Sequence, residues 1–581
     1  FICCLCGSSL VVFFRHLFFS FLKPDFMKCC SALLCLAAIV GCLVTTNADS
    51  TQVNSADELM QLFGSATGTL ETDIEVTADL DFSGSALTLP LGASSDGGCV
   101  TYTGAFHGNG HSIKGLVMNA ANNEGYKNSG LFCNLKDATV DDLVIDSSCS
   151  FTGVSSGALS VSVNGSLTAT NVVNNAKVTG SGSCVGGLIG TINADTSAIT
   201  LTGCTNNADV NGKGSTGGFF GIVDKAQCAT MMISNCANTG TVTCNGAAGG
   251  GFIGLIQECT DMSVTISKSM NNGNISVSSD GGGFIGLIKQ STNVSVTVSD
   301  CINDKDIKGS YTRGGLIGQL SDNSNMNVSI SNCSNNGSLT GYYPCLGGLV
   351  GLIDKCAGVI TISDCTNDGS VDGKEWIGGV VGLIRSSTDA GMIVTMTNLI
   401  NSGIINGEQT FGGLVGHITT NKMIEITMSN CTNNGNVTSS DVTGSGIGGF
   451  VGLVSSNEKL NMKIHYCFNN GDVTIIAHQL GGFIGSLRQN TQMKVEIIGS
   501  SNNGTIKAQH LFVGGFIGQL IQNQGNLTIS ESSNNGIING LTYVGGLVGD
   551  VQKTEINAFI SNCSNNGNIF GKSDAGGFIG S

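Results

Sequence analysis

One phrase recurs thirteen times along this chain, and the repetition limits its fold more than any other feature. The phrase is Gly-Gly, then two residues of core type, then Gly, as in "GGLVGLID" beginning at Gly347. Successive copies are separated by 31 to 36 residues, and a fixed period of this length is typical of repeat architectures. The leading glycines are Gly186, Gly217, Gly250, Gly282, Gly314, Gly347, Gly378, Gly412, Gly448, Gly481, Gly514, Gly545 and Gly576.

An asparagine lies 11 to 15 residues before every one of these glycines, although most residues around it vary. A residue type retained in all thirteen copies indicates a position that the fold requires. The asparagines are Asn174, Asn206, Asn238, Asn271, Asn303, Asn335, Asn367, Asn401, Asn433, Asn469, Asn502, Asn534 and Asn565.

Each repeat has the pattern of β-strands. Apolar and polar residues alternate with period two in "MNVSISNC" and "MKVEII". The chain contains 86 glycines, which disfavours helix. It has only two prolines beyond residue 48, Pro90 and Pro344. Proline cannot donate to a strand ladder, so its scarcity favours strands that are paired on both sides. We therefore predict an all-β, right-handed parallel β-solenoid of about 13 regular coils.

The anchors then have structural roles. In "VSISNCSNNG", Val328 and Ile330 are expected to point inward, and a corner at Asn332 turns Cys333 and Asn335 inward too. A buried amide needs partners, so we expect the asparagines to stack coil over coil. The Gly-Gly step is expected either to avoid a Cβ clash or to adopt positive φ.

Cysteine is frequent two residues before the asparagine. It alternates there with Val, Leu and Ser, which indicates a small core residue and not a metal ligand or an obligatory disulfide. Seventeen cysteines lie beyond residue 48, and some outside this column, such as Cys345 and Cys356, are expected to pair in an oxidising compartment. The column contains Val172, Cys204, Cys236, Ser269, Cys301, Cys333, Cys365, Leu399, Cys431, Cys467, Ser500, Ser532 and Cys563.

The chain divides into four expected regions. Residues 1–26 are expected to be upstream sequence translated in error, and residues 27–48, "MKCCSALLCLAAIVGCLVTTNA", have the layout of a signal peptide. Residues 49–130 are expected to form an N-terminal cap and the first strands, with a short helix near 55–65. Residues 131–581 hold the solenoid, with one or two degenerate coils near Gly130 and Gly157, and we expect it to continue past Ser581.

The net charge and the sequons of the chain are consistent with the export that a signal peptide implies. Without residues 1–48 the chain has 22 basic and 40 acidic residues (25 − 3 and 41 − 1), a net charge of −18, which argues against nucleic acid or anionic membrane as a partner. Eleven N-glycosylation sequons occur, and all but Asn164 fall on the outward phase. They are Asn164, Asn274, Asn293, Asn327, Asn332, Asn336, Asn430, Asn436, Asn503, Asn526 and Asn562.

The pattern resembles the GLUG repeat of large secreted and surface-attached microbial proteins. The glycine anchor carries the resemblance, together with "DIEVTADLDFSG", "YTGAFHGNGHSIKGLVM" and "GLFCNL", which are similar to the region that precedes such repeats. The resemblance covers residues 51 to 581 and implies a β-solenoid stalk or an adhesin-like surface protein.

No zinc-peptidase or phosphate-loop motif is present. The chain contains no His-Glu pair and no G-x-x-x-x-G-K-[ST] loop, and we expect no cofactor and no metal site. His107 and His111 in "FHGNGHSI" are interpreted as turn residues. The densest charged set is interpreted as a solvated turn; it consists of Asp300, Asp304, Lys305, Asp306, Lys308 and Arg313.

The sequence therefore predicts a non-catalytic, extracellular rod. It would be secreted or displayed on the cell surface and present a repetitive binding surface to host or matrix proteins or glycans, by multivalent weak contact. One alternative is a carbohydrate-active or carbohydrate-binding β-helix, since polysaccharide lyases and hydrolases share this architecture. A further alternative is an inert stalk for a domain beyond Ser581.

Overall fold

The computed structural model describes residues 50–581, except residues 86, 121–124, 343, 440–445, 477 and 510. The upstream segment and the signal peptide expected at residues 1–48 lie outside the described residues. Residues 52–581 form one compact unit, which contains every repeat.

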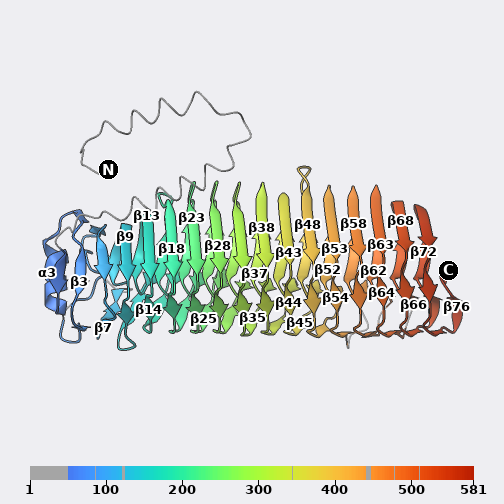
Figure 1. Ribbon diagram of the computed structural model, residues 1–581, viewed down its shortest axis with the longest axis horizontal. Helices are drawn as coiled ribbons and strands as arrows, with labels where there is room; N and C mark the ends of the chain where they lie inside the picture. Colours follow the sequence, from blue (N-terminus) through green and yellow to red (C-terminus); the bar gives the residue numbers. More distant parts are fainter. Residues whose placement is uncertain are drawn as a thin grey trace, which may run out of the picture. The chain divides into compact units, whose positions relative to one another are not determined.

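Each repeat forms one coil of five short strands (Figure 1). In the coil that ends at Gly347, the strands are β37 (Ile317–Ser321), β38 (Met326–Ser331), β39 (Ser334–Asn335), β40 (Leu339–Gly341) and β41 (Leu346–Gly347). The next coil repeats this order from β42 (Val350–Asp354) to β46 (Ile377–Gly378). The strand pattern in the sequence reflects this geometry, because alternate residues of β38 are buried.

The strands pair in parallel with the equivalent strands of the coils before and after. They build sheets of 31, 16, 15 and 14 strands, and the largest holds the strands equivalent to both β37 and β38. Asn335 pairs with Asn303 and Asn367, and Gly347 pairs with Gly314 and Gly378, so the repeats stack without a shift in register. The predicted all-β parallel β-solenoid is confirmed, with about 15 turns.

Two corners of each coil are made by a residue in the left-handed conformation. Asp322, between β37 and β38, has φ of 54°, and Asn332, between β38 and β39, has φ of 52°. The residue after each corner is buried: Asn323 in the first case and Cys333 in the second. The corner therefore breaks the alternation of the strand, which is why Cys333 and Asn335 point inward. Asn and Asp are favoured there because they tolerate this backbone.

The glycine anchors act through close approach and not through positive φ. Neither Gly347 nor Gly348 has a positive φ. A Cβ on Gly348 would lie 2.0 Å from the carbonyl oxygen of Gly379 and 2.4 Å from Cγ of Asn367, both in the next coil. Of the two expected explanations, the steric one is therefore correct. The two residues after the pair, Leu349 and Val350, are fully buried.

A continuous apolar core fills the coils. It includes runs of stacked phenylalanines, with ring centroids 4.7 Å apart for Phe219 and Phe252 and 4.9 Å apart for Phe252 and Phe284. These rings follow the Gly-Gly pair in successive coils, so a side chain of the same kind meets its own copy above and below. Offset contacts of this type add to the stabilisation from apolar burial.

The first coils are covered by the helix α3 (Ala56–Ser65), close to the range predicted from sequence. Ser55 is its N-cap and accepts a hydrogen bond from the Glu58 backbone N–H at 3.4 Å. Its buried face carries Phe63, whose ring centroid lies 5.6 Å from that of Tyr102. The helix therefore shields the apolar interior at this end of the solenoid (Figure 1).

The segment before residue 131 already belongs to the solenoid. The strands β4 (Leu80–Asp81), β7 (Ser112–Lys114) and β10 (Val144–Ile145) precede the asparagine strands in the same 16-stranded sheet. Ile113 pairs with Leu80 and with Ile145. Coil stacking therefore begins before the expected boundary at residue 131.

We predict that Gly348→Ala destabilises the solenoid, because the new Cβ would overlap a backbone oxygen that belongs to a paired coil. Overpacking of this kind costs about 1–3 kcal/mol. Gly84→Ala is the matched control, since a Cβ there would meet nothing within 4 Å. Urea unfolding followed by circular dichroism measures both; an equal midpoint for the two variants would contradict the steric role.

Candidate binding surface

The thirteen predicted asparagines form one column inside the solenoid. Asn335 Nδ2 donates to Asn367 Oδ1 at 2.7 Å and to the Gly337 carbonyl oxygen at 2.9 Å. The same pair of bonds recurs through the column, with amide-to-amide distances from 2.7 to 2.9 Å. Twelve of the side chains are fully buried, and Asn565 is half-buried. The column is therefore part of the scaffold and offers nothing to a ligand.

A second buried amide column lies at the other corner and was missed in the sequence. Asn421, Asn457 and Asn490 donate in turn to the amide of the next coil, each at 2.9 Å, and the column ends at Asn523. Asn323 holds the equivalent place in an earlier coil. Other coils have Ala226, Cys259, Ser291, Cys356 or Ser387 there, so the asparagine does not recur often enough to stand out.

The cysteine column is buried and unpaired. The thiols at its fully buried positions point into the core, and Cys333 Sγ donates to the Ser331 carbonyl oxygen at 3.1 Å. Cys345 and Cys356, which were expected to pair, are free, whereas Cys99 and Cys133 form a disulfide between neighbouring coils. Burial raises the pKa of Cys356 to about 11, so this thiol is protonated and non-nucleophilic at neutral pH.

The six charged residues between 300 and 313 do not converge on one site. Asp300 accepts a hydrogen bond from Asn332 at 2.5 Å, and Asp304 accepts one from Asn336 at 2.6 Å, each at its own corner of the coil. Lys305 is exposed. The carboxylate of Asp306 lies 3.3 Å from Nζ of Lys308 on the following strand.

Arg313 differs from the other five because it is fully buried. It was expected in a solvated turn, and that expectation is wrong. Its side chain lies inside the coil because the position equivalent to Arg313 precedes the Gly-Gly pair and faces a small apolar core in the neighbouring coils.

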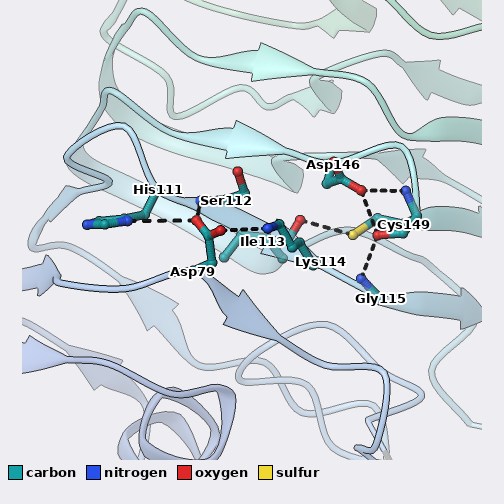
Figure 2. Close-up of polar contacts among 9 residues, drawn as sticks. Asp79, His111, Ser112, Ile113, Lys114, Gly115, Asp146 and Cys149 are labelled. Atoms are coloured by element: carbon teal, nitrogen blue, oxygen red, sulfur yellow. Dashed lines mark hydrogen bonds and ion pairs between the residues drawn. The ribbon is translucent and has the colours of Figure 1, made fainter.

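The two histidines of "FHGNGHSI" flank a turn. His107 ends strand β6 (Ala105–His107), and its Nδ1 lies 2.8 Å from Asp141 of the next coil. His111 precedes β7, with Nδ1 3.7 Å from Asp79 (Figure 2). Asp79 also accepts from Nζ of Lys114 at 2.5 Å and from the backbone N–H of Ser112 at 2.9 Å.

These contacts of Asp79 are bonds between coils and satisfy its carboxylate. The hydrogen bond from Lys114 holds the pKa of Asp79 below its ordinary value, and the Ser112 N–H acts in the same direction. Figure 2 also shows the corner one coil further on, where Asp146 accepts a hydrogen bond from the Ser148 backbone N–H and the Cys149 thiol donates to the Ile113 carbonyl oxygen. No group of three or more His, Cys, Asp or Glu residues placed to hold a metal is found among the described residues.

The predicted glycosylation sites lie mostly at the surface. The side chains of ten of the eleven asparagines are exposed, and Asn164 is half-buried between Asn134 and Asn193, to which it is hydrogen-bonded. A glycan on any of the ten would extend into solvent. No helix in the described part of the chain is long and apolar enough to cross a membrane.

One outer face carries an unusually uniform set of side chains. It consists of the outward residues of eight strands in the largest sheet, namely β13 (Ser160–Thr170), β18 (Ala198–Thr202), β23 (Thr230–Ser234), β28 (Ser263–Ser267), β33 (Ser295–Ser299), β38, β43 (Gly358–Ser363) and β48 (Met392–Thr397). We call this set the hydroxyl face. Its members, three per strand, are Ser166, Thr168, Thr170, Ala198, Thr200, Thr202, Thr230, Met232, Ser234, Ser263, Thr265, Ser267, Ser295, Thr297, Ser299, Asn327, Ser329, Ser331, Val359, Thr361, Ser363, Ile393, Thr395 and Thr397.

Nineteen of these 24 residues are serine or threonine, and none is charged. Charged residues make up roughly 25–35% of an ordinary soluble surface, so their absence from 24 outward positions is a property of this face. The pattern stops abruptly in the following coils, where Glu425, Lys463 and Glu496 occupy equivalent positions. In-register pairing places the hydroxyls in rows about 4.8 Å apart along the stack.

Comparisons with known proteins add little to this picture. No protein-family model and no curated protein matches the chain. One solved structure is similar over part of the length, described as a "putative immunoglobulin A1 protease" from Bacteroides ovatus. It is 18% identical, with a TM-score of 0.37, and the match covers 45% of this chain and 78% of that one. At this TM-score the similarity supports no inference about function.

His417 is a buried titratable group in the scaffold. It is 8% exposed and lies in a row between Leu383 and Leu453 of the neighbouring coils. Its Nε2 lies 2.9 Å from Ser455 Oγ, while Nδ1 has no hydrogen-bond partner. Burial lowers the pKa of His417 from 6.5 to about 4, because the charged form would lose its hydration.

We predict that Asn335→Ala lowers the free energy of unfolding by about 1–3 kcal/mol, because it removes the acceptor of a buried N–H of Asn303 and the donor to the buried Oδ1 of Asn367. Asn336→Ala is the matched control, since this neighbouring side chain is exposed and should change stability by no more than ~0.5 kcal/mol. Urea titrations compare the two. Equal effects would show that the column does not stabilise the coils.

We predict a second stability effect that depends on pH. Between pH 6.5 and 4 the unfolded state binds a proton at His417 that the folded state does not, so this residue makes stability fall as pH decreases through that window. The loss between pH 7 and pH 5 is about 2 kcal/mol. His417→Leu, which matches the residues above and below it, should remove that difference in urea titrations. A variant with the same pH dependence as the parent would refute the assignment.

Proposed function

We propose that this protein is a secreted or surface-displayed, non-catalytic rod that adheres through its hydroxyl face. The observation that carries the proposal is the array of 19 hydroxyls among 24 uncharged outward positions, held in register over eight coils. Every coil offers similar groups at a similar spacing. A partner with repeated polar groups, such as a matrix glycan or protein, would then be bound by many weak contacts whose effects multiply.

Two further observations support a role in binding and not in reaction. The array is uniform, whereas catalysis requires a few groups whose pKa values are set apart by their surroundings. The carboxylates between 300 and 313 point to separate corners and are already hydrogen-bonded, so they do not form an acid–base pair. Membership of the GLUG-repeat group, extracellular location and use of the sequons remain part of this proposal.

The proposal predicts that charge on the hydroxyl face abolishes adhesion. The test variant is Thr265→Lys with Thr297→Lys and Thr361→Lys, one change in each of three coils of the face. Retention of the full chain on immobilised matrix glycans and matrix proteins should drop by at least tenfold, since multivalent binding fails when several contacts are lost. The matched control is Asn207→Lys with Asn272→Lys and Asn434→Lys, three residues that each directly follow a strand of the 16-stranded sheet.

The same samples distinguish the alternatives. Adhesion that is equal in the two triple variants would contradict a role for the hydroxyl face. Release of reducing sugar from the immobilised glycans by the parent chain would contradict the non-catalytic assignment and support a carbohydrate-active enzyme. Failure of the parent chain to bind any surface would support an inert stalk.

A further inference from the structure

The repeat pattern is broken locally at one corner of the coils. The chain contains eight tyrosine and tryptophan residues in all, and four of them, Tyr311, Tyr342, Tyr343 and Trp376, fall within 66 consecutive residues. Tyr311, Tyr342 and Trp376 lie in the connections that follow β35 (Ile307–Gly309), β40 and β45 (Val371–Asp372). These connections link strands of the 15-stranded sheet to strands of the 14-stranded sheet, whereas the hydroxyl face lies on the 31-stranded sheet. In a regular scaffold, such a departure marks a place with a specific role.

A groove of about 450 Å³ runs across these coils, within the usual range of ~300–1,000 Å³ for small-molecule sites. Its side-chain walls are Lys308, Thr340, Tyr342, Asp372, Lys374 and Glu408, contributed by four successive coils. It therefore follows the long axis of the solenoid over about three coil spacings, or roughly 14 Å. That length suits an extended chain of a few units better than a compact molecule.

Glycines form the floor of the groove. Gly309 and Gly341 pair in register, and Gly373 holds the equivalent position in the next coil. A Cβ on Gly309 would lie 2.0 Å from the Val277 carbonyl oxygen, and one on Gly373 would lie 2.7 Å from Leu346. These neighbouring atoms leave no room for a side chain at the glycine positions. The floor of the groove is therefore bare backbone, and the side chains of the walls project above it.

An aromatic ring and paired charges line the walls. Tyr342 is 68% exposed, and Nζ of Lys374 lies 4.5 Å from its ring centroid. Lys374 is also 3.6 Å from the carboxylate of Glu408, and Asp372 accepts from Asn406 at 3.2 Å. Among the described residues of the walls, Tyr342 has the one largely apolar side chain, which disfavours a lipid or an apolar peptide.

A buried cation, Arg313, lies below the floor of the groove. The guanidinium of Arg313 is fully buried under Gly341, where a Cβ would lie 2.5 Å from Nη2. Its Nη2 donates to the Tyr311 carbonyl oxygen, while Nε and Nη1 have no partner. Asp280 opposes the fall in the pKa of Arg313 to about 10 that burial causes. Each cation of this corner thus has a carboxylate nearby, so the groove does not select a free anion.

We propose that this groove binds a short neutral oligosaccharide. A sugar ring would stack its C–H face on Tyr342, because those hydrogens carry partial positive charge and the ring face is negative. The sugar hydroxyls both donate and accept hydrogen bonds. The walls offer both kinds of partner, because donors and acceptors are mixed along Lys308, Thr340, Asp372, Lys374 and Glu408. The linear groove fits several units of such a chain.

The test uses the full chain with a panel of neutral hexose oligosaccharides and their uronic-acid counterparts, measured by calorimetry. We expect binding to a neutral oligosaccharide with little dependence on salt. Tyr342→Ala should weaken it by roughly tenfold or more, and Tyr342→Trp should retain it. Tyr466→Ala removes another exposed ring, 56% exposed, at a corner far along the chain and should have no effect.

Three results would overturn the proposal. These are no binding of any neutral oligosaccharide, equal affinity of the Tyr342→Ala and Tyr466→Ala variants, and a preference for uronic acids that salt abolishes. The hydroxyl-face triple lysine variant separates this inference from the proposed function. It should bind the oligosaccharide in solution as the parent does, and loss of that binding would count against the groove.

Discussion

The whole solenoid depends on neighbouring coils approaching closely enough for their amides to stack. From Asn206 onward, the side chain of a column asparagine occupies the space that a Cβ on the second glycine of the preceding coil would need, and Gly-Gly leaves that space open. Asn367, for example, donates to Asn401 of the next coil and to the Gly369 carbonyl oxygen. Since a buried amide without partners is costly, neither the asparagine nor the glycine can change alone. This coupling explains why these two positions persist while their neighbours vary.

Because the coils stack closely, the interior accepts fewer kinds of residue than the surface does. Inside, each residue meets its own copy above and below, so the core uses a few types, such as the stacked rings of Phe450, Phe483 and Phe516. Outside, the same register multiplies whatever the surface carries. A single hydroxyl in one repeat becomes a row of hydroxyls, and charges in a later repeat end that row. The lateral surface is therefore where coils acquire different roles.

The chemistry of the interior is consistent with a supporting role. Buried thiols such as Cys259 have a raised pKa, near 11, because burial disfavours the thiolate. The described disulfide joins Cys99 to Cys133 in the first coils, where the helix α3 and neighbouring strands cover the end of the stack. Arg313 and His417 are two buried polar groups in this interior, and both lie close in sequence to the aromatic groove.

The sequence by itself determined the coil, because period-two alternation and the thirteenfold recurrence of Asn and Gly-Gly depend only on contacts between equivalent residues. The inward phase of Val328, Cys333 and Asn335 followed from the same pattern. Only the tertiary structure showed that Asp322 turns the other corner, that Asn421 begins a second amide row, and that Arg313 is buried. It also revealed the hydroxyl face and the groove, because each is built from residues of several coils that are far apart in the sequence. A surface of that kind exists only once the register between coils is fixed.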